Sequence, residues 1–244
     1  MRTANPALNE EAFQGERVLA AGEAMSVQGT VVNAFWMLVV LLAATSLVWS
    51  RAMAAGAAPG LTLVGALAGF VVAMITIFKK AWAPITAPLY AVCEGLFLGG
   101  ISAVLETAYH GIVIQAVLLT FGTLAALLVA YRAHLITVTD KFRMGIVAAT
   151  GGIALVYLAS LVLGFFGVRI PLLFASGPVG IGFSLVVVVI AALNLVLDFD
   201  LIERAVRAGA PKYMEWYAAF GLMVTMVWLY IEILRLLSLF RQRR

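Results

Sequence analysis

Charged residues are scarce in this sequence, and their scarcity decides the class of protein. Asp, Glu, Lys and Arg make up 11% of the 244 residues, whereas 64% are hydrophobic. Soluble domains average about 25% charged and about 45–50% apolar residues. A chain of this length could not hide so many apolar side chains from water, because much of a small domain stays in contact with its solvent. The composition therefore excludes a soluble enzyme, a nucleic-acid-binding module and a disordered protein, and it predicts that the solvent is lipid.

Cysteine pairs, a cleavable leader and alternating strands are also missing. Cys93 is the single cysteine, which excludes an internal disulfide. Residues 1–28 are polar and mixed in charge, without the apolar core and small-residue cleavage site of a signal peptide. The apolar runs are continuous, whereas a membrane β-barrel needs alternation. The apolar runs are therefore expected to be helices.

Seven apolar runs are long enough to cross a membrane, for which about 20 residues are needed. They are Thr30–Ser50, Leu61–Phe78, Ala87–Thr107, Ile112–Tyr131, Met144–Phe166, Val179–Leu197 and Trp216–Leu239. The connections between them are short, which leaves no room for a soluble catalytic or binding domain. The sequence predicts an all-α integral membrane protein with a polar tail (residues 1–28), a seven-helix membrane domain (residues 29–240) and a basic end (residues 241–244).

The distribution of Lys and Arg predicts that the N-terminus lies in the cytoplasm. Ten of these residues fall on the side of the N-terminus and five on the opposite side, which agrees with the positive-inside rule. Three of those five are Arg241, Arg243 and Arg244 at the end of the chain. A re-entrant last segment would return this cluster to the cytoplasm, but the segment is long enough to cross, so we expect seven spans.

Two pairs of small residues indicate where helices pack closely. Gly65 and Gly69 are separated by three residues, and so are Gly95 and Gly99. Such pairs allow the backbones of two membrane helices to approach each other. We interpret them as packing positions without a functional role.

Acids within the apolar runs are the main candidates for function, because a charge at the centre of a bilayer costs about 2.5–3.5 kcal/mol on insertion scales. The four acids are Glu94, Asp198, Asp200 and Glu232. Asp200 has Arg204 four residues later and Glu203 has Arg207, which favours an ordinary solvated helix end for both acids. Asp198 has no such partner, lies deeper and shares a helix face with Asn194, so we interpret it as functional. Glu94 either bonds a neighbouring helix or lines a cation path, and Asn194 and Asp200 are further candidates for that path.

The last segment carries one polar or small-residue stripe at helical spacing, which suits the interior of a bundle. Its members are Glu215, Ala218, Gly221, Thr225, Trp228, Glu232 and Arg235. Arg235 lies three residues after Glu232 and either neutralises it or extends to the interface and leaves Glu232 to another partner. If Asp198 and Glu232 meet within lipid, both would not ionise, and the pair would hold one proton and titrate as a unit. Such a pair would form a pH-sensitive latch or a relay for protons or cations.

Three stretches resemble the bacterial branch of the transmembrane Bax inhibitor motif family. They are YAVCEGLFLGGISAVLE at 90–106, LNLVLDFDLIE at 193–203 and WYAAFGLMVTMVWLYIEILRLL at 216–237. The resemblance implies a seven-helix bundle whose last helix is central. It also implies a pH-sensitive calcium leak channel with a proton-sensing acid pair, which falls on Asp198 and Glu232. The basic partner of that pair falls on Lys79 or Lys80, where the family has Arg, and Glu232 stands where the family has Asp.

Two functions are therefore expected from different classes. The first is a cation leak channel, calcium in particular, gated by protonation of Asp198 and Glu232, with no cofactor besides Ca²⁺ as the permeant ion. The second follows from bacterial relatives and is an interaction protein that modulates a membrane-bound ATP-dependent protease through residues 1–28. The resemblance places either in the bacterial inner membrane. We expect no enzyme, because neither an H-E-x-x-H motif nor a placeable Ser/His pair is present.

Overall fold

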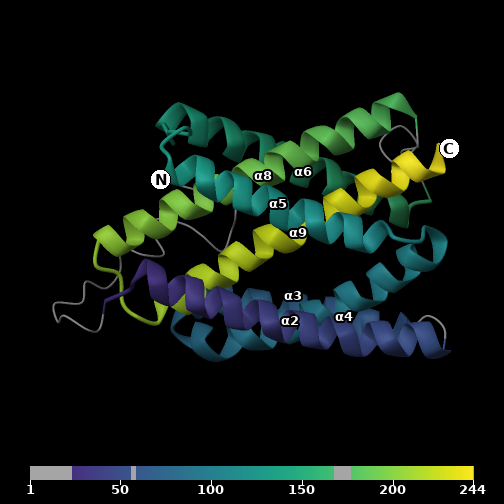
Figure 1. Cartoon of the computed structure of the whole chain (residues 1–244), viewed down its shortest axis with the longest axis horizontal. Helices are drawn as coiled ribbons and strands as arrows, with labels where there is room; N and C mark the ends of the chain where they lie inside the picture. The colour runs from purple at the N-terminus through teal and green to yellow at the C-terminus, as the bar shows by residue number, and fades with distance from the viewer. Residues whose placement is uncertain (1–23, 56–58, 168–176, 244) are drawn as a thin grey trace. The chain divides into compact units, whose positions relative to one another are not determined.

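Seven long helices form the part of the chain that the structure, a computed structural model, describes, namely residues 24–55, 59–167 and 177–243. All seven are long and apolar enough to cross a membrane, which confirms the predicted all-α membrane fold. They are α2 (Val27–Ala55), α3 (Pro59–Phe78), α4 (Ala83–Ala108), α5 (Ile112–Arg132), α6 (Asp140–Phe165), α8 (Pro178–Arg207) and α9 (Met214–Gln242), and a short 3₁₀ helix, η1 (Lys80–Trp82), precedes α4 (Figure 1). Most of the expected N-terminal tail, residues 1–23, lies outside the described residues.

Local sequence accounts for several helix boundaries. The Thr139 side chain accepts a hydrogen bond from the Phe142 N–H and thereby caps the start of α6. Gly111 precedes α5 with a φ of 81°, a conformation that favours glycine. Helix α8 is longer than the sixth apolar run, because it continues beyond Leu197 through polar residues to Arg207. Asp198 and Asp200 therefore lie inside a regular helix.

The described chain divides into two compact units, and helices α8 and α9 contribute to both. Unit 1 comprises Met1–His110 and Asp200–Val224, and unit 2 comprises Gly111–Phe199 and Thr225–Arg244. Half of the residues in the most apolar stretch of α9 are buried. Among the seven spans, only the one formed by η1 and α4 has the same buried share. This burial agrees with the expectation that the last helix is an interior one.

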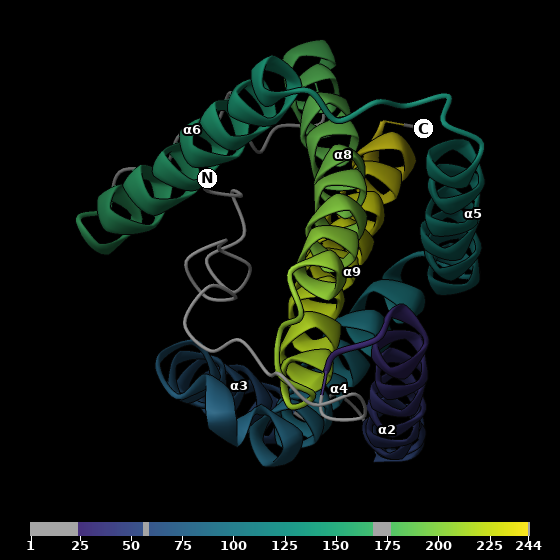
Figure 2. The same cartoon turned by 90° about the vertical axis from the view of Figure 1, so that its left-hand side faces the viewer.

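Helix α4 lies between α2 and α3 in unit 1 (Figure 2). A Cβ atom added to Gly95 would lie 2.6 Å from the Cβ of Ala44 on α2, and one added to Gly65 would lie 2.7 Å from the carbonyl oxygen of Cys93 on α4. Neither site has room for a side chain. The two glycine pairs thus mark helix contacts, as predicted.

Ser26 caps the start of α2, and a residue from another helix of unit 1 holds Ser26 in place. The Ser26 hydroxyl accepts a hydrogen bond from the Gly29 N–H at 2.9 Å, which is the usual N-cap contact. Both the backbone N–H and the hydroxyl of Ser26 donate to Glu215 Oε1 of α9, each at 2.9 Å. In a capping box the glutamate stands three residues after the cap, on the same helix. Here that position is Gly29, whose missing side chain leaves the space that the Glu215 carboxylate fills.

Unit 2 is held together by polar and aromatic contacts between its helices. The Asn194 amide of α8 donates to the Thr150 hydroxyl of α6 at 2.9 Å. The rings of Tyr157 on α6 and Phe183 on α8 meet edge to face, with centroids 6.3 Å apart. Unit 2 therefore brings α6 and α8 together around the polar residues of α8 and α9.

Candidate functional site

Asp198 is a buried acid whose carboxylate lacks hydrogen bonds. Its exposed fraction is 1%, and both carboxylate oxygens are buried without a hydrogen-bond partner. The side chain of Thr225 on α9 lies next to the carboxylate. Asn194, one turn earlier on α8, uses its amide on Thr150 and on the Ile190 carbonyl, so it does not donate to Asp198. Within the described part of the chain, an ionised carboxylate at this place would lack both a counter-charge and a donor of good geometry.

Glu232 is equally buried, at 3% exposure, but it belongs to a network of three polar side chains. The Tyr157 hydroxyl of α6 donates to Glu232 Oε1 at 2.6 Å, and Arg235 Nη1 donates to the same hydroxyl at 2.5 Å. Arg235 Nη1 also lies 3.6 Å from Glu232 Oε2. The guanidinium lies over the rings of Tyr157 and Phe183, at 5.5 and 5.8 Å from their centroids, which adds cation–π attraction.

This network decides between the two interpretations of Arg235. The guanidinium neutralises Glu232 within unit 2, as the first interpretation expected, and Tyr157 bridges the two charges. Burying an acid and a base together avoids the larger cost of burying either charge alone. Glu232 is thus a partnered acid, whereas Asp198 is an unpartnered one.

The structure does not bring the Asp198 and Glu232 carboxylates together. Asp198 lies beside Thr225, whereas Glu232 is seven residues further along α9, a rise of about 10 Å. Tyr157 and Arg235 hold Glu232 in its own surroundings. Proton sharing between the two acids therefore stays a prediction, and it requires a rearrangement of α8 or α9.

The acids at the end of α8 form ion pairs on their own helix, as their spacing predicted. Arg204 Nη2 lies 2.6 Å from Asp200 Oδ2, and Arg207 Nη2 lies 3.9 Å from Glu203 Oε2. Asp200 thus has a local counter-charge, unlike Asp198 two residues earlier. Its role in a cation path remains a prediction.

Glu94 lies between α3 and α4 in unit 1. Its Oε1 would be 3.4 Å from a Cβ atom at Gly69, which is an ordinary van der Waals contact, so the carboxylate lies against α3. The Tyr90 side chain, one turn earlier on α4, reaches the carboxylate, while Oε2 is buried without a hydrogen bond. Of the two interpretations of Glu94, these contacts favour placement against a neighbouring helix.

The predicted basic partners belong to a different unit from the acid pair. Lys79 follows the last residue of α3 and is exposed, and Lys80 begins η1 and is partly buried. Both lie in unit 1, whereas Asp198 and Glu232 lie in unit 2. Their pairing with the acids stays a prediction. Over the described residues, no group of three or more His, Cys, Asp or Glu side chains is placed to hold a metal ion.

The family of the chain follows from its whole length. The family profile described as Bax inhibitor 1 like matches residues 5–242. The chain belongs to this family. No curated protein and no solved structure matches it.

Two partners of the acids in this Bax inhibitor 1 like chain were found only in the structure. Thr225 stands in the polar stripe of the last segment, which predicted that it faces inward but not which acid it meets. Tyr157 was missed, and the signal was a hydroxyl in the apolar run from 144 to 166, which also contains Thr150 and Ser160. Because a buried hydroxyl needs a partner, such a residue indicates contact with a polar side chain of another helix.

Proposed function

We propose that the chain is a proton-regulated cation leak pathway, with calcium as the main permeant ion and Asp198 as the group that senses protons. The observation that carries the proposal is the buried carboxylate of Asp198, whose two oxygens have no hydrogen-bond partner. A buried ion without compensation is costly, whereas a neutral carboxylic acid in the same place costs far less. The packing energy between α8 and α9 at this point therefore changes with the proton on Asp198.

The neighbouring residues give the proton a defined effect on these two helices. A protonated Asp198 has a hydroxyl that can bond Thr225 across the contact between α8 and α9. An ionised Asp198 needs water or a cation beside it, because the described residues place no ion-pair partner at its carboxylate. Calcium prefers oxygen ligands, and carboxylates provide them. Loss of the proton thus favours entry of a cation, and gain of the proton favours closure.

The direct test is calcium flux into proteoliposomes at several pH values, with a calcium-sensitive dye inside. Flux should rise with pH in the wild-type protein. Asp198→Asn imitates the protonated acid, so its flux should stay at the low-pH value of the wild type throughout. Asp200→Asn is the matched control, because it makes the same change at an acid that already has Arg204 as a partner, and it should keep the pH response.

Three outcomes would contradict parts of the proposal. An unchanged pH response in Asp198→Asn removes Asp198 as the sensor. If Glu232→Gln abolishes the response as fully as Asp198→Asn, the two acids act as the pair that the sequence predicted. The absence of calcium flux from folded wild-type protein overturns the leak pathway itself.

The second candidate is an interaction protein of the bacterial inner membrane that modulates a membrane-bound ATP-dependent protease. The observation that favours it is the attachment of the last part of the tail to the turn between α8 and α9. The Met25 N–H donates to the Ala210 carbonyl at 2.7 Å, and Met25 is buried next to the turn between α8 and α9. Deletion of residues 1–23 should then abolish capture of the protease and leave calcium flux intact. Loss of flux with retained capture would argue against this role.

A further inference from the structure

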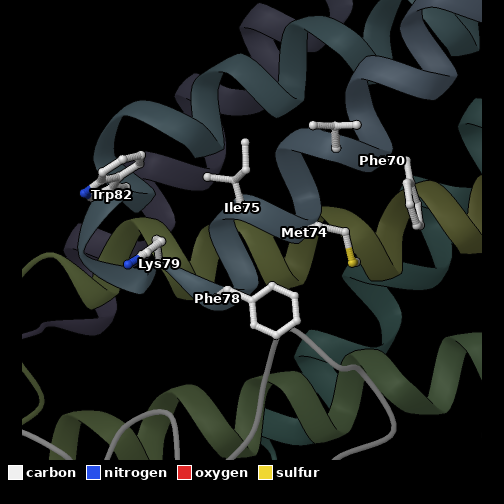
Figure 3. A pocket seen from close by; sticks show the side chains of 7 residues that line it. Phe70, Met74, Ile75, Phe78, Lys79 and Trp82 are labelled. Atoms are coloured by element: carbon white, nitrogen blue, oxygen red, sulfur yellow. The ribbon is translucent and has the colours of Figure 1, made fainter.

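An open apolar groove follows α3 and ends at Lys79, the one cationic residue among the described residues that line it. The groove has a volume of about 420 Å³, and its lining residues are Phe70, Val71, Met74, Ile75, Phe78, Lys79 and Trp82. All seven belong to unit 1, on α3, η1 and the residue between them. Figure 3 shows Lys79 and Trp82 together at one end of the groove and Phe70 at the other.

The two ends of the groove differ in chemistry. Lys79 directly follows Phe78, the last residue of α3. Trp82, at the same end of the groove, is 58% exposed. Tryptophan and lysine are the residues that membrane proteins place at the level of the lipid headgroups. From there the groove runs inward along α3, and Phe70 and Phe78 are eight residues apart, a rise of about 12 Å. This stretch has the polarity of a lipid tail.

We propose that this groove binds an anionic phospholipid, whose acyl chain lies along α3 and whose headgroup phosphate contacts Lys79. The charge of Lys79 complements a negative headgroup, and the remaining lining is apolar or aromatic. Phe78 is 78% exposed at the mouth of the groove, where it can cover the upper part of the chain. Basic residues at the cytoplasmic end of a membrane helix attract anionic lipids in this way.

The test compares phosphatidylglycerol with phosphatidylcholine on the purified full-length protein, by native mass spectrometry of lipid adducts. Phosphatidylglycerol should bind more tightly. Lys79→Gln should weaken its binding about five-fold, the loss expected for one basic residue near a membrane surface, without affecting phosphatidylcholine. Lys141→Gln is the matched control, since Lys141 is also an exposed lysine beside a helix end.

A second variant tests the apolar part of the site. Met74→Trp fills the groove with a larger ring and should reduce binding of phosphatidylglycerol several-fold at unchanged charge. Leu155→Trp is its control, because Leu155 is 68% exposed on α6 and is not one of the residues that line the groove. Circular dichroism and gel filtration establish that each variant is folded before its adducts are counted.

Quenching of Trp82 provides an independent measurement. The contribution of Trp82 to the tryptophan fluorescence is the part that disappears in Trp82→Phe. Brominated phosphatidylglycerol should quench this part more strongly than brominated phosphatidylcholine does. Equal binding of the two lipids by the wild type, or equal binding by Lys79→Gln and Lys141→Gln, overturns the proposal. If Met74→Trp changes the oligomeric mass and not the number of lipid adducts, the groove binds a second copy of the chain, and the lipid site is wrong.

Discussion

At the scale of single residues, Asp198 and Glu232 differ in what surrounds them, although both are buried acids of unit 2. Tyr157 and Arg235 supply Glu232 with a hydrogen bond and a counter-charge. Asp198 has Thr225 beside it and no completed hydrogen bond. The same chemical group therefore has two kinds of surroundings. The partnered acid links α9 to α6, and the unpartnered acid is the group that we propose as the proton sensor.

The bridging role of Tyr157 leads to a prediction about stability. Tyr157→Phe removes the hydroxyl that bonds Glu232 and Arg235 but keeps the ring under the guanidinium. Hydrogen bonds between membrane helices contribute about 0.6 kcal/mol on average and up to about 1.7 kcal/mol, and this one involves a charged acceptor, so we expect a loss of about 1 kcal/mol. Unfolding in mixed micelles measures the free energy of unfolding of the variant.

A double-mutant cycle with Glu232→Gln separates this bond from other effects of the tyrosine. If the bond to Glu232 carries the loss, Tyr157→Phe should cost less in the Glu232→Gln background than in the wild type. Additive losses in the double variant would show that Tyr157 acts through packing alone, and the assignment of a three-residue network would then be wrong.

At the scale of elements, the cap of α2 is divided between two helices that are far apart in the sequence. Ser26 supplies the cap, Gly29 leaves the space, and Glu215 of α9 supplies the carboxylate. A negative charge at the start of a helix is also favoured by the helix dipole. This contact joins the last residues of the N-terminal tail to the beginning of the last helix within unit 1.

The divided cap predicts that the carboxylate can be moved from one helix to the other. Glu215→Ala should lower the free energy of unfolding by about 1 kcal/mol, the usual cost of a lost cap contact. Gly29→Glu alone should also destabilise the protein, because its Cβ overlaps the Glu215 carboxylate. The double variant Gly29→Glu/Glu215→Ala restores a capping box within α2 and should recover most of the loss in thermal unfolding.

The control for this exchange is Gly29→Ala/Glu215→Ala, which changes the helix propensity at position 29 without adding a carboxylate. If the control recovers as much stability as the double variant with glutamate, the gain comes from helix propensity alone. The cap would then contribute nothing measurable.

Hydropathy predicted the elements well and their contacts poorly, for a physical reason. In lipid, an apolar run of sufficient length forms a helix because its backbone groups must bond to each other. The seven predicted runs are therefore the seven long helices of the structure. The end of α8 was placed too early, because its pairs Asp200–Arg204 and Glu203–Arg207 continue the helix without apolar residues. Spacing along one helix predicted those pairs. Contacts such as Tyr157 with Glu232 depend on which helices pack together, and no single segment contains that information.

At the scale of the whole molecule, the unbroken last helix leads to a prediction about the side of the membrane on which the chain ends. Helix α9 runs without interruption over 29 residues, Met214–Gln242, a length of about 43 Å that exceeds the ~30 Å hydrocarbon layer. A re-entrant segment needs a break at which the chain turns back, and α9 has none. Arg235 is held by Glu232 and Tyr157 inside unit 2, so it does not mark an early end of the span.

We therefore predict that the two ends of the chain lie on opposite sides of the membrane, with the N-terminus in the cytoplasm. Reporter fusions that are active on only one side, joined before residue 1 and after residue 244, should give opposite signals. A reporter inserted after Thr137, in the connection between α5 and α6, should match the N-terminal signal. Four of the seven described membrane spans precede this position, and an even number of crossings returns the chain to the same side. Equal signals from the two ends would mean that one helix does not cross, and the cluster Arg241, Arg243 and Arg244 would then follow the positive-inside rule.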